Sequence, residues 1–547
     1  MRATTVFSLT IVVTSLAAPA AAQDALDRVQ RGERSPVEDR TVPPSAQPGV
    51  EVQVEQPESV PGGREVLVGA VVLAGLEVLQ PADFAEVITP RLGQVLDEAG
   101  LRELTGAVAA EARSRGFPFA TASIEPQRLT SGVLTVHVDE GRIDELRFDG
   151  PATPAVRAAL APLVSGAPAR LSDVEHRLLI AGDIDGARIR NSRYIREQGR
   201  GILLIELSRD PAVVRAALSN EGTKPLGPVQ LRIDADVNGL LADDDQLTVS
   251  YTGTPANPRE LNFGLVRYAR RVSSGGTEVA LTGSASRARP GAYLRSLGLR
   301  SQSWYVGGSV LQPLWRRRTG SLWLEGELGL RNLRQWQQDA LVRDDRLAVA
   351  RATLYGYADV GDGRLRASLT LAQGFDIFDA TEPGDPLASR FDADGTFTTL
   401  NAWAQWSRSL GSGFSMRLAA QGQLASQPLL ISEETSLGGT GFLRGYDWGE
   451  RSGDEGIMGS AELRYDWNRP FDLVRNAQFY GFLDGGSVRN IDSDFGSGSL
   501  ASVGGGMRAD LSDTLGAAVE LAVPLSGPRY DTGDETPKIN LRVNKSF

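Results

Sequence analysis

Residues 437–448 read LGGTGFLRGYDW, with four glycines and a single arginine, Arg444. Glycines this dense disfavour a regular strand or helix, yet alternating strand patterns lie on both sides. We therefore expect a long loop inside a β-rich region, and such loops are usually functional or disordered. The Phe, Tyr and Trp of the stretch argue against disorder. An ordinary surface loop with a solvated arginine is the plain alternative.

The composition excludes several classes of protein. The chain has 547 residues and a net charge of −11, which argues against a nucleic-acid binder. It has no cysteine and 2 histidines, so a disulfide scaffold, a Cys/His metal site and a cysteine nucleophile are excluded. His137 and His176 lie far apart and are expected to be ordinary surface or strand residues. We expect no cofactor.

Residues 1–22 have the pattern of a secretory signal peptide. Arg2 gives the positive end, an apolar run follows, and Ala20, Ala21 and Ala22 fit the small-residue cleavage site. No later apolar run is long enough for a spanning helix. The mature chain is therefore expected to be exported, and any membrane insertion would need a β-barrel.

Residues 23–63 are expected to form a linker. Six prolines stand at positions 36, 43, 44, 48, 57 and 61, which favours an extended segment. Residues 24–33 could form a short polar helix. Two interpretations stay open for it: a disordered tail, or a helix that plugs a pore.

The sequence pattern of residues 64–141 predicts a small α/β domain with the element order β-α-α-β-β. The expected elements are strands at 66–74, 119–127 and 133–138, a helix opened by Pro81 and a helix at 101–114. The order and the ending resemble a POTRA domain of the two-partner type. The residues that carry this resemblance are Pro126, Gln127, Gly132, Glu140 and Gly141.

Residues 142–210 repeat the plan and predict a second POTRA domain. Strands are expected at 142–148, 187–196 and 202–208, with helices at 154–163 and 171–180. The resemblance is weaker and depends on element order together with Gly182 and Gly186. A generic α/β module is the alternative for both domains.

Residues 211–547 predict a transmembrane β-barrel. Segments of about ten residues alternate with period 2, separated by turn residues, as in membrane barrels with a polar interior. The clearest has Leu515, Ala517, Val519, Leu521 and Val523 on one face. At roughly 20 residues per strand and loop, about sixteen antiparallel strands are expected. A soluble β-sandwich array would also alternate, but the signal peptide and the terminal Phe547 count against it.

The whole order resembles the two-partner secretion transporters, the haemolysin secretion/activation family within the POTRA-plus-barrel superfamily. The resemblance implies export of a large, unfolded, β-rich partner protein across the Gram-negative outer membrane, with periplasmic POTRA domains that recognise it. Phe547 resembles the signal read by the barrel-assembly machinery. Alternatives are an assembly insertase of the same superfamily or, less favoured, a passive porin. No nucleophile elbow, phosphate loop or His-based triad supports an enzyme; a carboxylate hydrolase on a barrel is the alternative among enzymes.

In this family the Arg-Gly-Tyr/Phe loop folds back into the barrel, here residues 437–456 with the motif Phe442, Leu443, Arg444, Gly445 and Tyr446. Strand parity places Asp484 on the luminal face. Its pattern Phe482, Asp484 and Gly486 matches the family's receiving strand. Because an arginine fork can hold a carboxylate at two points, we predict an ion pair between Arg444 and Asp484. Solvated charges at both positions are the alternative.

Overall fold

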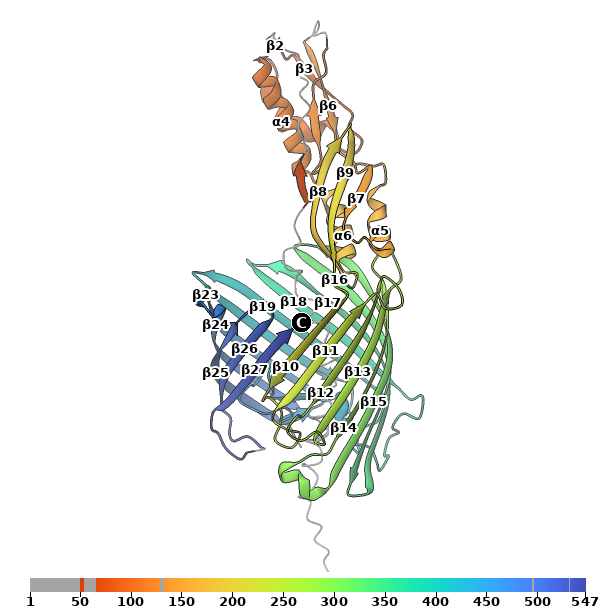
Figure 1. Ribbon diagram of the computed structural model, residues 1–547, viewed down its shortest axis with the longest axis vertical. Helices are drawn as coiled ribbons and strands as arrows, with labels where there is room; N and C mark the ends of the chain where they lie inside the picture. Colours follow the sequence, from red (N-terminus) through yellow and green to blue (C-terminus); the bar gives the residue numbers. More distant parts are fainter. Residues whose placement is uncertain (1–49, 54–64, 128–131, 494–495, 531) are drawn as a thin grey trace, which may run out of the picture.

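The computed structural model describes residues 50–53, 65–127, 132–493, 496–530 and 532–547. The expected signal peptide, the possible plug helix and most of the linker lie outside this range. The part of the chain that is described forms a column of two small α/β domains standing on a β-barrel (Figure 1). No helix in the described ranges is long and apolar enough to cross a membrane.

The barrel is closed by sixteen antiparallel strands in chain order, which confirms the predicted fold class. Along β24 the exposed Phe479 and Leu483 alternate with the buried Tyr480 and Asp484, as the strand parity predicts. The strands are β10 (Ala212–Ser219), β11 (Gln230–Asn238), β12 (Asp245–Gly253), β13 (Leu261–Arg271), β14 (Glu278–Ala288), β15 (Leu299–Arg317), β16 (Gly320–Gln337), β17 (Ala340–Val360), β18 (Gly363–Phe375), β19 (Phe397–Gly411), β20 (Phe414–Ala425), β23 (Glu455–Phe471), β24 (Val474–Arg489), β25 (Gly498–Asp510), β26 (Leu515–Pro524) and β27 (Lys538–Ser546).

The first α/β domain packs one long helix on a three-stranded sheet of order β3-β6-β5. Asp97 caps that helix by accepting from the backbone N–H of Gly100 at 2.8 Å, and its apolar face is buried. The elements are β2 (Val66–Leu67), β3 (Ala70–Ala74), the 3₁₀ turn η1 (Pro81–Phe84), α3 (Ala85–Ile88), η2 (Thr89–Arg91), β4 (Val95–Leu96), α4 (Glu98–Ser114), β5 (Thr121–Ser123) and β6 (Val133–Asp139).

Three elements of this domain differ from their predictions. The strand expected at 66–74 is divided into β2, which pairs with β4, and β3, which pairs with β6. The helix expected at Pro81 is a 3₁₀ turn followed by a four-residue α-helix. The strand expected at 119–127 is only three residues long. Pro126 has no backbone N–H to donate to a ladder, and the side chain of Gln127 instead exchanges two hydrogen bonds with the backbone of Thr135, at 2.8 and 2.9 Å.

The second α/β domain has a four-stranded sheet of order β1-β8-β9-β7. Its elements are β7 (Glu145–Asp149), α5 (Pro154–Leu160), η3 (Ala161–Leu163), α6 (Leu171–Gly182), β8 (Ala187–Glu197) and β9 (Arg200–Arg209). The edge strand β1 (Val50–Gln53) comes from the predicted linker and runs parallel to β8. Part of the linker is therefore a strand of this sheet, which its proline content did not indicate.

The two α/β domains share a buried junction. Phe119 of the first domain stacks on Tyr194 of the second with ring centroids 3.8 Å apart, and neither side chain is exposed. The hydroxyl of Tyr194 donates to the carbonyl of Arg142 at 3.1 Å. Gly141 at the junction has φ +79°, and an added Cβ would lie 2.6 Å from Phe119. A glycine is therefore required here for both backbone and space.

The second domain docks on the barrel rim through a charged side chain that is buried. Asp183, at the end of α6, accepts from Arg316 at 2.9 and 2.6 Å. Arg316 lies on β15 and is 2% exposed, and its guanidinium also covers the ring of Trp323. Close by, Arg177 donates to the carbonyl of Ser274 at 3.1 Å. The domain column and the barrel thus share a largely buried ion pair and an exposed hydrogen bond.

We predict that Asp183→Ala loosens this docking. The substitution leaves the buried Arg316 charge unpaired, which costs several kcal/mol in a fully buried pair; since Asp183 is partly exposed, we expect about 2 kcal/mol. The natural chain has no cysteine, so spin labels can be placed at Glu206→Cys and Asp362→Cys. The inter-label distance distribution should broaden in the variant. The exposed Asp173→Ala on the same helix is the control, and an unchanged distribution in Asp183→Ala would contradict the prediction.

Candidate functional site

The loop between β20 and β23 enters the barrel and is folded as a compact hairpin. Two short strands, β21 (Thr435–Leu437) and β22 (Arg451–Gly453), pair at its base. Beyond them the N–H of Glu450 donates to the carbonyl of Leu437, and the N–H of Gly439 donates to that of Tyr446, at 3.1 and 3.2 Å. We call residues 437–450 the lumen loop; Arg444 is at its tip.

Arg444 and Asp484 form the predicted ion pair. Nε and Nη2 of Arg444 donate to the two oxygens of Asp484 at 3.0 and 2.9 Å, and the backbone N–H of Arg444 donates at 3.1 Å. The arginine side chain is 3% exposed and that of the aspartate 0%. Both charges are removed from water, and the two-point contact between them offsets the free-energy cost of that desolvation.

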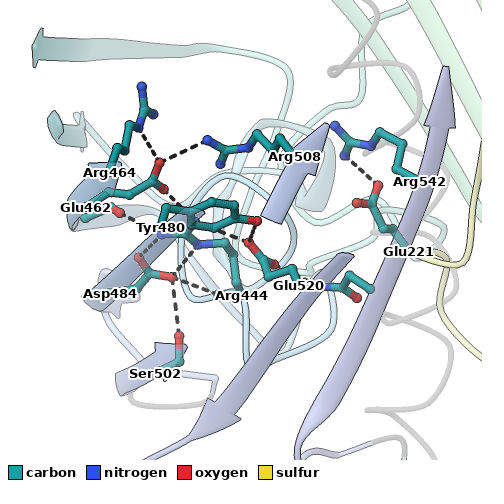
Figure 2. Close-up of polar contacts among 12 residues, drawn as sticks. Glu221, Arg444, Glu462, Arg464, Tyr480, Asp484, Ser502, Arg508, Glu520 and Arg542 are labelled. Carbon is teal, nitrogen blue, oxygen red and sulfur yellow. Dashed lines mark hydrogen bonds and ion pairs between the residues drawn. The ribbon is translucent and has the colours of Figure 1, made fainter. Parts of the chain in front are cut away.

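Two further carboxylates surround the same guanidinium (Figure 2). Nη1 of Arg444 lies 2.9 Å from Glu462 on β23 and 3.3 Å from Glu520 on β26. Two more arginines balance the three acids, since Arg464 and Arg508 both contact Glu462, at 2.6 and 3.1 Å. The result is a luminal network of three cations and three anions drawn from the loop and four wall strands.

Apolar contacts surround this network. The Arg444 guanidinium lies 3.4 Å from the ring centroid of Phe482, a cation–π contact. Leu443, Phe442 and Tyr446 are buried against the wall. The wall provides room at Gly486, where an added Cβ would lie 3.0 Å from Leu437 and 3.1 Å from Leu443.

The backbone at the tip approaches the wall closely. An added Cβ on Gly445 would lie 2.8 Å from the backbone nitrogen of Pro524 and 2.9 Å from Ser502. Leu443 has φ +59°, a conformation that L side chains rarely adopt. Tyr446 accepts from the N–H of Ser526 at 2.8 Å and donates to the carbonyl of Gly527 at 3.2 Å. The tip is therefore held by close packing at Gly445 and by the Tyr446 hydroxyl as well as by charge.

A second set of ion pairs holds the other end of the same connection. Arg351 on β17 lies 2.8 Å from both oxygens of Glu433, just before β21. Arg390, in the segment between β18 and β19, lies 2.9 Å from Glu434 and 2.7 Å from the fully buried Asp454. The connection is thus anchored to the β17 side of the barrel as well as to β24.

Sequence reasoning missed Glu462, Glu520 and both arginines that balance them. A signal was present for Glu462, because the outward phase of Ile457, Leu463 and Tyr465 leaves position 462 facing the lumen. Nothing in the sequence relates Glu520 to the loop. Its place beside Arg444 depends on barrel closure and on the stagger between distant strands.

The residues that carry the POTRA resemblance lie at turns and junctions. The Glu140 carboxylate, 2% exposed, accepts from the backbone N–H groups of Glu77, Val78 and Leu79. The carbonyl of Gly132, which has φ +68°, accepts from Gly69 and Ala70. Pro126 is exposed. The set shapes the domain and its junction rather than lining a pocket.

At the other end of the chain, Phe547 continues the ladder that closes the barrel. Its N–H donates to the carbonyl of Val214 on β10 at 2.9 Å, while its side chain is 74% exposed. Lys545 donates to the hydroxyl of Thr514 at 2.7 Å. The terminal ring is thus presented on the outside of the closing strand.

The luminal network binds and positions a loop. Its arginines and carboxylates are matched to one another, and within the described ranges no group of His, Cys, Asp and Glu side chains is arranged to hold a metal ion. The architecture is that of a transporter of the POTRA-plus-barrel class. It combines a closed barrel of sixteen strands, a loop folded into the lumen and a column of α/β domains on the rim.

Comparison with known proteins gives the family. Residues 201–509 match the haemolysin secretion/activation protein family ShlB/FhaC/HecB, and residues 66–141 match the ShlB-type POTRA domain. The chain belongs to this family. It is an outer-membrane transporter of two-partner secretion, which moves an exoprotein across the outer membrane.

Several relatives are similar over most of their length. The heme/hemopexin transporter protein HuxB of Haemophilus influenzae strain 86-028NP is 22% identical, over 83% of this chain and 82% of the relative. The structure of CdiB from Escherichia coli matches with a TM-score of 0.74 at 20% identity, over 99% and 100% of the two chains. BamA from Haemophilus ducreyi lacking POTRA domains 1–3 matches with a TM-score of 0.51 at 12% identity, over 87% and 99%. At these identities the structural matches show the fold.

We predict that Arg444→Ala detaches the tip of the lumen loop from β24 and reduces secretion at least tenfold, while the barrel persists. The substitution leaves three carboxylates without their central cation, and breaking a buried network of this kind costs about 3–5 kcal/mol. Asp484→Ala should be milder, since Glu462 and Glu520 still hold the guanidinium. The double variant should be scarcely worse than Arg444→Ala, because the pair acts as one unit. Secretion and heat-modifiable migration on gels are the measurements.

Two controls separate charge from geometry. Arg444→Lys keeps the charge but loses the planar fork, and should recover only part of the secretion. Arg451→Ala removes an exposed arginine near the same loop and should secrete normally. Wild-type secretion by Arg444→Ala, or fully additive losses in the double variant, would refute the pairing.

Proposed function

We propose that this protein captures its exoprotein in the periplasm through the POTRA domains and passes it, unfolded, through the barrel lumen to the cell surface. The observation that carries the proposal is the placement of the domain column. The sheet of the second domain ends at Arg209 on β9, and the barrel begins at Ala212 on β10. Asp183 and Arg316 join the same domain to the rim. A segment held on the column is thereby brought to the mouth of the barrel.

Extended polypeptide is the cargo that this column suits. Edge strands and grooves beside helices can add a strand through backbone hydrogen bonds, largely independent of sequence. In the first domain both β3 and β5 are sheet edges, and α4 packs on β5 and β6. We assign the initial capture to this domain, residues 66–141.

Passage requires the lumen loop to move. Residues 437–450 occupy the lumen and are held by matched charges together with a small apolar cluster against the wall. The charged side chains freed by the movement would be hydrated in a water-filled pore, which lowers the cost of separating them. With no nucleotide in the periplasm, folding of the exoprotein outside supplies the direction.

Orientation in the membrane follows from the strand order. Strand β10 leaves the side on which the POTRA domains stand, so the connections after β18 and β20 lie on the opposite side. We assign the POTRA side to the periplasm and these connections to the exterior. The exposed apolar face of the barrel meets the outer-membrane lipid, and Phe547 engages the barrel-assembly machinery during insertion.

The function is tested by deleting the gene and comparing the secreted proteins. One large protein should disappear from the medium, and wild-type transporter should restore it. A variant that lacks residues 66–141 and carries Tyr194→Thr, to repolarise the surface that the deletion uncovers, should not restore it, because capture is lost. Its barrel should remain heat-modifiable, since the β10–β27 closure uses no residue of the first domain.

Two outcomes would contradict the proposal. Continued secretion by the variant without residues 66–141 would refute capture by the first domain. Loss of other outer-membrane proteins, with no exoprotein missing from the medium, would support the insertase alternative instead.

The orientation is tested with an epitope tag. A tag inserted between the exposed Pro383 and Gly384, in the connection between β18 and β19, should be labelled on intact cells. A matched tag between Ser512 and Asp513, in the turn between β25 and β26, should need permeabilised cells. The reverse pattern would overturn the assigned orientation.

A further inference from the structure

A row of polar side chains crosses four neighbouring strands of the barrel, at the end away from the α/β domains. Gln302 of β15 lies opposite Arg287 of β14 and Arg334 of β16. On the next strand, β17, Asp344 lies opposite Arg334. Strands β14 and β15 can be followed to this end of the barrel in Figure 1. Because neighbouring strands are about 4.8 Å apart, the backbones of Arg287 and Arg334 lie at one level, about 10 Å from each other.

The phase of the strands turns this row outward, to the side that faces lipid. On β15, Arg300 shares a phase with the exposed Trp304 and Val306. On β14, Arg287 shares a phase with the exposed Leu281. Charged side chains on the lipid face of a barrel are costly at mid-membrane and tolerated near its surfaces. The row therefore marks the level of a membrane interface.

Two arginines on the next strands belong to the same level. Arg334 has the phase of the exposed Leu328 on β16. Arg346 has the phase of the exposed Leu354 on β17. We call these four side chains the arginine row: Arg287, Arg300, Arg334 and Arg346.

Carboxylates neutralise one half of the arginine row. Asp344 lies 3.1 Å from Arg334 and 3.0 Å from Arg346. Asp379, in the connection between β18 and β19, lies 3.9 Å from Arg346. Two arginines and two acids balance here, so any surplus of positive charge comes from the other half.

That other half is not neutralised. Arg287 is exposed, and within the described ranges it forms no ion pair and no side-chain hydrogen bond. The guanidinium of Arg300 covers the ring of Trp336 at 4.5 Å, and its Nε has no hydrogen-bond partner among the described residues. Two guanidinium groups can therefore bind an anion.

The connection between β14 and β15 does not supply that anion. Residues 289–298 read RPGAYLRSLG, with Arg289 and Arg295 and no acidic residue. The carboxylate of Glu260 packs beside this connection, and Asp339 lies in the adjoining turn after β16. These two acids balance the two arginines of the connection in charge, which leaves the unneutralised half of the row as the surplus.

Large apolar side chains are exposed beside the row. Ile377 and Phe378 are both exposed, and they directly precede Asp379, which contacts Arg346. Trp304 is exposed on the lipid side of the row. A face with cations at the interface and aromatic and aliphatic side chains next to them suits a lipid with an anionic head group.

We propose that this face binds a phosphate-bearing glycolipid of the outer leaflet. Arg287 and Arg300 hold its phosphate groups, while Trp304 and Phe378 contact its acyl chains. Arginine suits this role because its planar fork can hold a phosphate at two points. The phosphate-bearing glycolipids of a Gram-negative outer membrane lie in its outer leaflet, and phospholipids form the inner one. The proposal rests on the proposed orientation, which puts this end of the barrel outside.

Lipid binding to the purified full-length protein tests the site. The probe is lipid A with two phosphates, titrated in a non-ionic detergent and followed by native mass spectrometry. In a variant with Arg287→Gln and Arg300→Gln the affinity should fall about tenfold or more, because two charge-assisted contacts with phosphate are lost. Phosphatidylglycerol, which has one phosphate, should bind the wild type about tenfold more weakly than lipid A for the same reason.

The matched control removes two exposed arginines at the other end of β15. Arg317→Gln with Arg318→Gln changes the net charge by the same amount, and Arg317, like Arg300, covers a tryptophan ring. This variant should bind lipid A as the wild type does. Both variants should keep the heat-modifiable migration of a folded barrel, since neither pair of arginines takes part in the β10–β27 closure.

Four results would overturn the proposal. Equal affinity for lipid A in the wild type and in the variant of Arg287 and Arg300 would refute the site, and an equal loss in the control would show binding by net charge alone. Phosphatidylglycerol that binds as tightly as lipid A would refute the assignment to a glycolipid. Displacement of lipid A by an equal concentration of inorganic phosphate would show a site for free anions only.

These measurements separate the lipid site from the proposed function. Binding in detergent needs neither an exoprotein nor a membrane, so a deletion strain that loses no exoprotein would refute the function and leave the lipid result unchanged. The reverse epitope-tag pattern would instead refute the orientation, and with it the assignment to the outer leaflet, even where lipid A binds.

Discussion

Arg444 is a full positive charge held away from water inside a barrel, and the arrangement of the lumen depends on neutralising it. The cost of desolvating an ion is recovered only when partners are close and well oriented. Asp484 provides the two-point contact, while Glu462 and Glu520 fill the remaining side of the guanidinium. These acids in turn need Arg464 and Arg508. One loop residue thereby fixes the side-chain choice on several wall strands.

The lumen loop is consequently a held element rather than a mobile one. Charge fixes its tip at β24, the Tyr446 hydroxyl bonds to the backbone of Ser526 and Gly527, and Arg351 fixes the approach at Glu433. Each anchor joins the connection to a different part of the wall. Release at one anchor alone leaves the others, so a movement that clears the lumen has to break them together.

The elements predicted well are those fixed by local pattern. Period-2 alternation and segment length predicted the barrel and its strand number. Parity placed Asp484 in the lumen, and the resemblance of two short motifs to the family predicted its pairing with Arg444. The elements missed depend on contacts distant in sequence. Glu520, the bidentate contact of Asp183 with Arg316 and the pairing of β1 with β8 join segments with no shared local signal. The strand predicted too long at 119–127 shows a second cause of error, because the side chain of Gln127 replaces backbone pairing there.

The stacked rings of Phe119 and Tyr194 also bear on how such transporters can be recombined. Phe119 belongs by sequence to the first domain but packs into the core of the second. Arg316 likewise belongs to the barrel but completes the end of α6. Boundaries drawn at the ends of the domains would therefore cut through two packed interfaces. A chimaera that exchanges one domain has to carry the residue its neighbour depends on, so the transplantable unit is the domain together with its reciprocal contact.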